Sequence, residues 1–226
     1  MLFNALRSVY RRVPSPIRSR IWLWRHPESR LEGKLSKKTR AGIEGFLERL
    51  AAEGILTGNV LEIGAGARVN NKRRFAATAL HYWRSDLSPW PNSPSLDVYC
   101  DCTRMPFKPR ALDGIICSEV LEHVQDATKA IQEMSQVLKP GGYLVITVPF
   151  FYPLHGVNKK DYGDFWRFTP GTLRVLFAPG FEVLRLEATH LFHPKDPFVL
   201  NIQMLLRRNS AAGCTGKDRV VSGPRV

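Results

Sequence analysis

A short apolar segment that runs directly into a glycine-rich turn constrains the fold of this chain more than any other feature. Residues 60–66 read Val-Leu-Glu-Ile-Gly-Ala-Gly. The two glycines, Gly64 and Gly66, let the backbone approach a ligand where a β-carbon would collide. Asp86 ends a second short segment, twenty residues after Gly66. The two segments together predict a βαβ unit that holds a nucleoside by its ribose.

The turn differs from one that binds the pyrophosphate of a dinucleotide. A G-x-G-x-x-G motif needs glycine at position 69, which is Val69 here. Glu62 also places an acid where it would repel a diphosphate. A cationic nucleoside such as S-adenosylmethionine (SAM) suits an acidic strand end better, so SAM is the favoured cofactor. A nicotinamide-dependent dehydrogenase remains the less favoured alternative.

Predicted helices and strands alternate along the chain. Apolar spacing predicts helices at 35–53, 72–80 and 127–138, and a further helix that begins with a Thr169 cap and Pro170. Strands are expected at 59–63, 81–86, 96–100, 112–117, 143–148, 182–188 and 198–206, with a Lys-Pro-Gly-Gly turn at 139–142. Strands separated by helices indicate a parallel sheet, and the closing pair of strands indicates an antiparallel edge.

Composition is typical of a single globular domain with reduced thiols. The chain has 226 residues, 44% of them apolar, and no apolar run of the length that spans a membrane. The first ten residues lack the apolar region of a secretory signal. Four cysteines without framework spacing indicate a reducing compartment, and Cys100 and Cys102 are read as packing residues and not as metal ligands. We therefore expect a cytoplasmic protein, or one peripheral to the inner face of a membrane.

The net charge of +13 is concentrated at the two ends of the chain. Residues 1–40 carry eleven Lys or Arg against two Glu, and 205–226 carry five against one Asp, whereas the rest is neutral. This distribution predicts a basic amphipathic arm or lid (1–40), a catalytic domain (41–208) and a basic, flexible tail (209–226). Interleaved Leu, Ile and Trp favour contact between the arm and an anionic membrane, with a solvated arm as the alternative. An organelle transit peptide is disfavoured by Pro14 and Pro16.

Six short motifs occur in one order along residues 55–190. They are 60–66, Ser-Asp-Leu-Ser (85–88), Asp101 with Met-Pro-Phe (105–107), Leu-Asp-Gly (112–114), Glu-Val-Leu-Glu-His-Val (119–124) and Val-Leu-Lys-Pro-Gly-Gly (137–142). Together they resemble class I SAM-dependent methyltransferases of the methyltransferase type 11 group. The resemblance implies an α/β fold: a Rossmann-like seven-stranded, mostly parallel sheet with helices on both faces and an antiparallel last strand. It also implies methyl transfer from SAM to a small-molecule, saccharide or lipid-linked acceptor.

The resemblance implies cofactor-binding roles for eight residues. These are Glu62, Gly64, Gly66 and Ser118 near the methionine moiety, Asp86 at the ribose hydroxyls, and Leu87, Asp101 and Cys102 at the adenine. One departure is Arg68, which stands where the family's loop usually has a third glycine. Its cation must point away from the sulfonium for SAM to bind well. A catalytically idle SAM-binding or membrane-associated accessory protein is therefore the alternative function.

The loop at 149–170 follows a predicted strand and is expected to face the acceptor, because α/β sheets bind ligands at the carboxyl ends of their strands. His155 is the predicted base for a hydroxyl acceptor, and Tyr162 is the second catalytic candidate. The segment 165–170 resembles a signature of bacterial methyltransferases often associated with cell-surface glycan pathways. Arg167 is read either as an anion clamp or as a tie between the loop and Asp164.

The other histidines are not assigned chemistry. His123 is read as a packed histidine beside the cofactor. His190 and His193, with Asp196, offer too few ligands for zinc, so no metal site is expected. No specific nucleic-acid binding is expected either.

Overall fold

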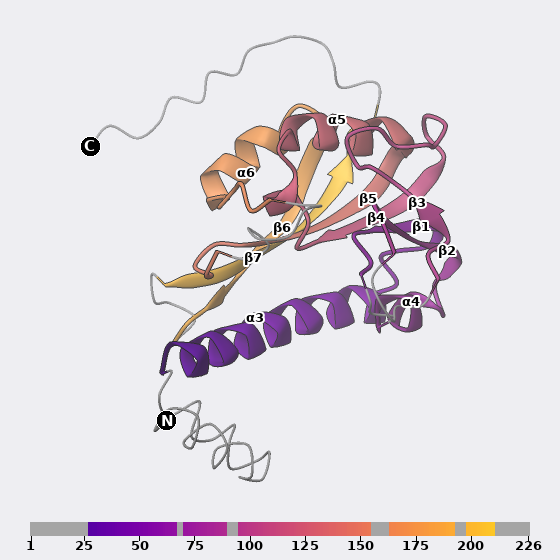
Figure 1. The fold of residues 1–226 in the computed structure, drawn as a ribbon. Helices are drawn as coiled ribbons and strands as arrows, with labels where there is room; N and C mark the ends of the chain where they lie inside the picture. The colour runs from indigo at the N-terminus through magenta and orange to yellow at the C-terminus, as the bar shows by residue number, and fades with distance from the viewer. Residues whose placement is uncertain (1–26, 67–69, 90–94, 155–162, 193–197, 211–226) are drawn as a thin grey trace, which may run out of the picture.

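The computed structural model describes residues 27–66, 70–89, 95–154, 163–192 and 198–210, and Figure 1 shows the chain as a ribbon. Seven strands form one sheet in the order β3-β2-β1-β4-β5-β7-β6. The strands are β1 (Gly58–Ile63), β2 (Ala79–Asp86), β3 (Val98–Tyr99), β4 (Leu112–Ser118), β5 (Leu138–Pro149), β6 (Phe181–His190) and β7 (Val199–Arg208). The helices are α3 (Pro27–Ala52), α4 (Asn70–Phe75), α5 (Ala127–Val137) and α6 (Pro170–Phe177), with a 3-10 turn η1 (Leu121–His123).

Strands β1 to β5 pair in parallel, and β7 runs antiparallel to both of its neighbours, β5 and β6. The predicted seven-stranded, mostly parallel sheet with a reversed last strand is therefore confirmed. The reversed strand lies inside the sheet, because β7 inserts between β5 and β6, and β6 forms the edge. Parallel strands end at the same side of the sheet, so the segments that follow β1, β2, β4 and β5 meet along one carboxyl edge.

Helices cover both faces of the sheet (Figure 1). Side chains alternate between the two faces of a strand, so neighbouring residues of β5 enter different layers. Val145 packs with Phe46 and Leu50 of α3, whereas Ile146 packs with Met134 of α5 and Leu173 of α6. Apolar side chains are thus fully buried on each face of the sheet, and this burial is the main source of its stability.

Some predicted boundaries differ from those observed. The helix predicted at 72–80 ends at Phe75, because β2 pairs with β1 from Ala79 onward and this pairing overrides local helical spacing. The strand predicted at 96–100 is reduced to Val98–Tyr99. The predicted turn at 139–142 forms the start of β5, where Gly141 has a φ of 79° and the pairing with β4 is irregular. The Thr169 cap is present, since its side chain accepts a hydrogen bond from the Thr172 amide.

Helix α3 runs without interruption from Pro27, so it passes through the expected boundary at residue 40. Within the described residues, no helix is long and apolar enough to cross a membrane.

Candidate functional site

The glycine turn after β1 is joined to the end of β2 through Asp86. The amide of Gly66 donates to Oδ2 of Asp86 at 3.0 Å, and the Leu87 amide donates to Oδ1 at 2.8 Å. Both turn glycines have positive φ, 68° at Gly64 and 54° at Gly66, a conformation that side chains disfavour. Asp86 is therefore held beside the turn, as expected for an acid that takes the ribose of a nucleoside.

Glu62 lies buried near the end of β1, with 6% of its surface exposed. Its Oε1 accepts a hydrogen bond from Nδ2 of Asn71 at 2.7 Å, which links β1 to α4. Its Oε2 and the Tyr82 hydroxyl are both buried and have no hydrogen bond within the described residues. Burial raises the pKa of Glu62, while the Asn71 bond, the nearby Tyr82 hydroxyl and the charges of two arginines oppose that rise. Glu62 thus places a carboxyl group next to the glycine turn.

The two candidates after β3 differ in exposure. Asp101 is exposed, and its Oδ1 accepts the amide and the hydroxyl of Thr103 at 2.8 and 2.7 Å. Cys102 is buried, which raises the pKa of its thiol to about 12 and keeps the thiol protonated. The Cys100 amide donates to the Asp86 carbonyl at 3.0 Å, so this segment lies next to the end of β2. Both candidates therefore lie near Asp86.

The remaining cofactor candidates also lie at the carboxyl edge. Leu87 is exposed just after β2, with 58% of its surface accessible. Ser118 ends β4, and its Oγ lies 2.8 Å from Oγ1 of Thr147 on β5. Although the fold brings all eight candidates to one edge of the sheet, their contacts with SAM stay predictions.

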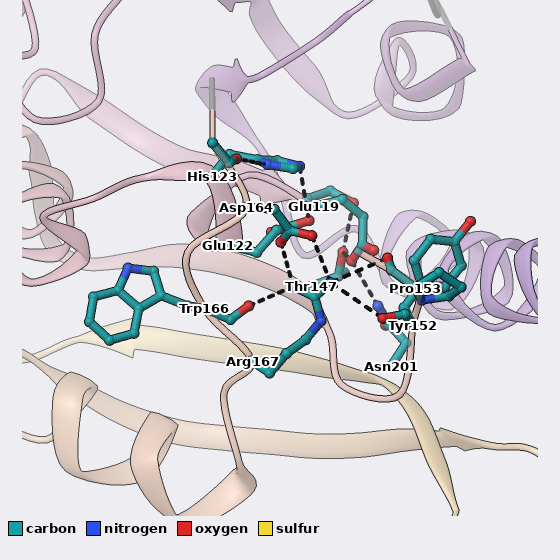
Figure 2. A network of polar contacts seen from close by, with 12 residues as sticks. Glu119, Glu122, His123, Thr147, Tyr152, Pro153, Asp164, Trp166, Arg167 and Asn201 are labelled. Atoms are coloured by element: carbon teal, nitrogen blue, oxygen red, sulfur yellow. Dashed lines mark hydrogen bonds and ion pairs between the residues drawn. The ribbon is translucent and has the colours of Figure 1, made fainter. Parts of the chain in front are cut away.

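In the loop that was predicted to face the acceptor, Arg167 is bound by other residues of the same loop (Figure 2). Its Nη1 and Nη2 contact the two carboxylate oxygens of Asp164 at 2.5 and 2.8 Å. Further bonds go to the carbonyls of Trp166 and Tyr152. The Asp164 side chain has no exposed surface. Of the two readings of Arg167, the structure supports the tie to Asp164, since the guanidinium has little capacity left for a ligand. His155 and Tyr162 lie outside the described residues.

Two further acids, Glu119 and Glu122, lie in the same network (Figure 2). Oε1 of Glu119 accepts from Oγ1 of Thr147 at 2.8 Å and from Nδ2 of Asn201 at 2.7 Å. Glu122 is completely buried, and its carboxyl oxygens have no hydrogen bond within the described residues. Burial first, and the nearby Glu119 second, raise the pKa of Glu122 well above its ordinary value.

Sequence reasoning assigned these two acids to a motif but gave neither a role. The sequence nevertheless contains a signal for them. Residues 119–124 directly follow a predicted buried strand, at the edge of the sheet where ligands bind, and acids among apolar residues at such a position indicate a functional site. Nδ1 of His123 lies 2.5 Å from the carbonyl of Gly163, so this histidine is packed, as predicted. Among the described residues, no three His, Cys, Asp or Glu side chains are grouped to hold a metal ion.

The strand order, the glycine turn and the acid at the end of β2 define a Rossmann-like domain of the methyltransferase class. Residues 35–191 match the family model of the methyltransferase domain, and the chain belongs to this family. The predicted class, SAM-dependent methyltransferases, is thereby confirmed, with SAM as the cofactor of that class.

Individual relatives are distant or matched over part of their length. Demethylmenaquinone methyltransferase of Renibacterium salmoninarum is 34% identical over 73 residues, which is 32% of this chain and 30% of that protein. Polyketide synthase ThaQ of Burkholderia thailandensis is 25% identical over 194 residues, 70% of this chain but 9% of that protein. The chain thus spans less than a third of these two relatives. The N-methyltransferase NodS of Bradyrhizobium japonicum, solved with S-adenosyl-L-homocysteine, has a similar fold: TM-score 0.54, 16% identity, covering 75% of this chain and 87% of NodS.

Proposed function

We propose that this chain transfers a methyl group from SAM to a small-molecule, saccharide or lipid-linked acceptor. The observation that carries the proposal is the 3.0 Å hydrogen bond between the Gly66 amide and Asp86, which fixes an acid beside a turn with room for a ligand. Among the described residues, a β-carbon at Gly66 would meet no atom closer than 4.0 Å, so none of them fills the space beside the turn. These residues fit a nucleoside with a cationic sulfur better than a dinucleotide.

SAM supplies the reactive methyl carbon when it is bound. The chain's own part is alignment and the exclusion of water. Asp86 accepts hydrogen bonds from the ribose hydroxyls, and Glu62 and Ser118 line the methionine end. His155 and Tyr162 remain the proposed groups of the acceptor loop, with His155 as a base.

An acceptor with an apolar part is favoured by the exposed aromatic residues at the carboxyl edge. The Phe151 amide donates to the Val199 carbonyl at 3.2 Å, which joins the end of β5 to the start of β7. Phe192 and Phe198 stack edge to face at 6.1 Å. All three phenylalanines have at least half of their surface exposed. Such a surface beside a site suits a lipid-linked acceptor better than a free sugar.

A peripheral position on an anionic membrane is part of the proposal. Lys34, Lys37 and Lys38 are exposed on α3, and Nζ of Lys38 donates to the Leu191 carbonyl at 2.7 Å, next to Phe192. Basic and aromatic groups are therefore adjacent, as on interfacial surfaces. We assign the arm at 1–40 to this contact, 41–208 to the catalytic domain and 209–226 to a basic tail.

Two measurements test the function. Calorimetry should detect binding of SAM and not of NAD. Turnover of SAM to S-adenosylhomocysteine should then appear with a lipid extract or an acceptor panel of alcohols, sugars and amines. The second candidate, an idle SAM-binding protein, is favoured by Arg68 in the glycine loop. It would bind SAM but yield no turnover with any acceptor fraction.

A further inference from the structure

A buried chain of polar side chains crosses β7 and ends on the carboxylate of Glu119. Gln203 donates from Nε2 to Oδ1 of Asn201 at 2.6 Å and to Oγ1 of Thr189 at 2.9 Å. Asn201 in turn donates to Glu119, and Thr147 donates to the same oxygen. Thr147, Asn201 and Gln203 are at most 2% exposed. Polar groups buried this deeply cost stability unless they are paired, so their convergence on one acid requires an explanation.

The backbone of Glu119 is also unusual. Its φ is 56°, in the left-handed region that residues other than glycine rarely adopt. The amide of Glu119 donates to the Thr147 carbonyl at 2.9 Å and holds the residue in this conformation. Strain of this kind persists where the surroundings over-determine it, and it gathers at functional sites.

The position of Glu119 connects the two halves of the site. Ser118, immediately before it, is the candidate for the methionine end of SAM. Val120, immediately after it, packs against the glycine turn, since a β-carbon at Gly64 would be 2.3 Å from its γ2 methyl. Oε1 of Glu119 is fixed from the other side by β5 and β7. The Glu119 carboxylate also lies near Arg167 of the loop at 149–170, because the charge of that guanidinium lowers the pKa of Glu119.

Glu119 differs from the neighbouring acids because its carboxylate is available to a ligand. Glu122 has no exposed surface and Asp164 is bound by Arg167, whereas Glu119 is partly exposed. Among the described residues, every hydrogen bond to the Glu119 carboxylate falls on Oε1, so Oε2 is left for a ligand. Burial raises the pKa of Glu119, and the bonds from Thr147 and Asn201 oppose that rise, as does the charge of Arg167.

We propose that Glu119 is the general base that takes the proton of a hydroxyl acceptor during methyl transfer. The acceptor oxygen forms its bond to the methyl carbon while the carbon–sulfur bond breaks, and that electron pair stays on sulfur. The acceptor proton moves to Oε2 of Glu119, which is neutral afterwards and returns the proton to solvent. The inference rests on the proposed function and names Glu119, ahead of His155, as the proton acceptor.

The first test requires no acceptor. In protein labelled with ¹³C at the glutamate carboxyl carbon, the resonance that Glu119→Gln removes should titrate above the ordinary glutamate value. Thr147→Val, which deletes one donor to Oε1, should raise that midpoint further. A midpoint at or below the ordinary value, or one unmoved by Thr147→Val, overturns the inference. The titration needs no turnover, so it tests Glu119 separately from the proposed function. If no acceptor supports turnover, that failure counts against the proposed function and not against the role of Glu119.

The second test uses the acceptor fraction that supports turnover of the unmodified protein. Glu119→Gln should lower kcat by about a hundredfold and abolish the acidic limb of the pH–rate profile, with SAM affinity unchanged by calorimetry. Glu182→Gln, at the opposite edge of the sheet, is the matched control and should leave kcat unchanged. Unchanged kcat in Glu119→Gln overturns the proposal.

Discussion

The γ2 methyl group of Val120 lies where a side chain at Gly64 would begin, because a β-carbon built on Gly64 would be 2.3 Å from it. Within the part of the chain that the structure describes, a β-carbon on Gly66 would meet nothing closer than 4.0 Å. Both glycines have positive φ. Gly66 is therefore required for its conformation, whereas Gly64 is required for its conformation and for the contact between the glycine turn and the segment after β4.

Gly64→Ala should consequently destabilise the protein more than Gly66→Ala. Each change imposes a positive φ on alanine, at about 1–2 kcal/mol. Gly64→Ala adds a steric overlap that typically costs about 1–3 kcal/mol. Urea unfolding of the two variants measures the difference. Adding Val120→Ala to Gly64→Ala should recover part of the loss, and equal losses in both glycine variants would contradict the close contact.

Asp86→Ala should weaken SAM binding by about 2–4 kcal/mol, since it removes the two charge-assisted hydrogen bonds that we propose between Asp86 and the ribose. The variant also removes the acceptor of the Gly66 amide, so the glycine turn loses its support. Isothermal calorimetry with SAM measures the loss.

Asp86→Asn is the matched control because it keeps one oxygen for the Gly66 amide but lacks the charge. Its loss of affinity should be intermediate. Affinity equal to that of the unmodified protein in both variants would remove Asp86 from the ribose site.

The sequence predicted most of the fold because local signals and pairing agreed. The glycine turn, Asp86 and the Thr169 cap each depend on a few adjacent residues, and all three are present in the structure. The antiparallel closing pair was predicted from strand spacing, but the insertion of β7 between β5 and β6 was not, because it depends on contacts far apart in the chain. A role for Glu119 could not be predicted for the same reason, because its partners Thr147 and Asn201 are far away in the sequence.

Glu122→Gln should change how stability depends on pH. The pKa of Glu122 is raised in the folded protein, so the folded state keeps a proton that the unfolded state releases above about pH 4.5. The contribution of Glu122 to the free energy of unfolding is therefore full below about pH 4.5. It falls by about 1.4 kcal/mol per pH unit as the pH rises toward the pKa of the folded state. Glutamine removes this slope. Urea unfolding between pH 5 and 8 should therefore show a flatter profile for the variant.

The control for this measurement is Glu48→Gln, because Glu48 is exposed on α3. Its stability profile should parallel that of the unmodified protein. If the profile of Glu122→Gln also runs parallel, then Glu122 does not hold a proton in the folded state at neutral pH.

Arg167→Ala should destabilise the protein by about 3 kcal/mol, because it removes the cation that contacts both oxygens of the buried Asp164 carboxylate. Arg167→Lys should recover only part of this, since an ammonium cannot reproduce the paired contacts to both oxygens. The exposed pair of Arg207 and Glu182 is the control, and Arg207→Ala should cause only a small loss. If Arg167→Ala and Arg207→Ala lowered stability by similar amounts, the result would contradict the burial of the Arg167–Asp164 pair.

The final prediction concerns the basic arm. Deleting residues 1–26 removes six arginines and no acidic residue. Binding to vesicles that contain anionic phosphatidylglycerol should fall sharply, because each basic residue near such a surface contributes about 1 kcal/mol. Replacing Lys34, Lys37 and Lys38 with glutamine in the full chain should weaken binding by a smaller factor.

Sedimentation with vesicles at low and high salt measures both effects, since binding by charge weakens as salt screens it. Neutral phosphatidylcholine vesicles are the control and should bind weakly throughout. SAM affinity should survive the deletion because every cofactor candidate lies downstream of residue 26. If the full chain does not bind anionic vesicles, the arm has no membrane role, and the exposed phenylalanines are left as part of the acceptor site alone.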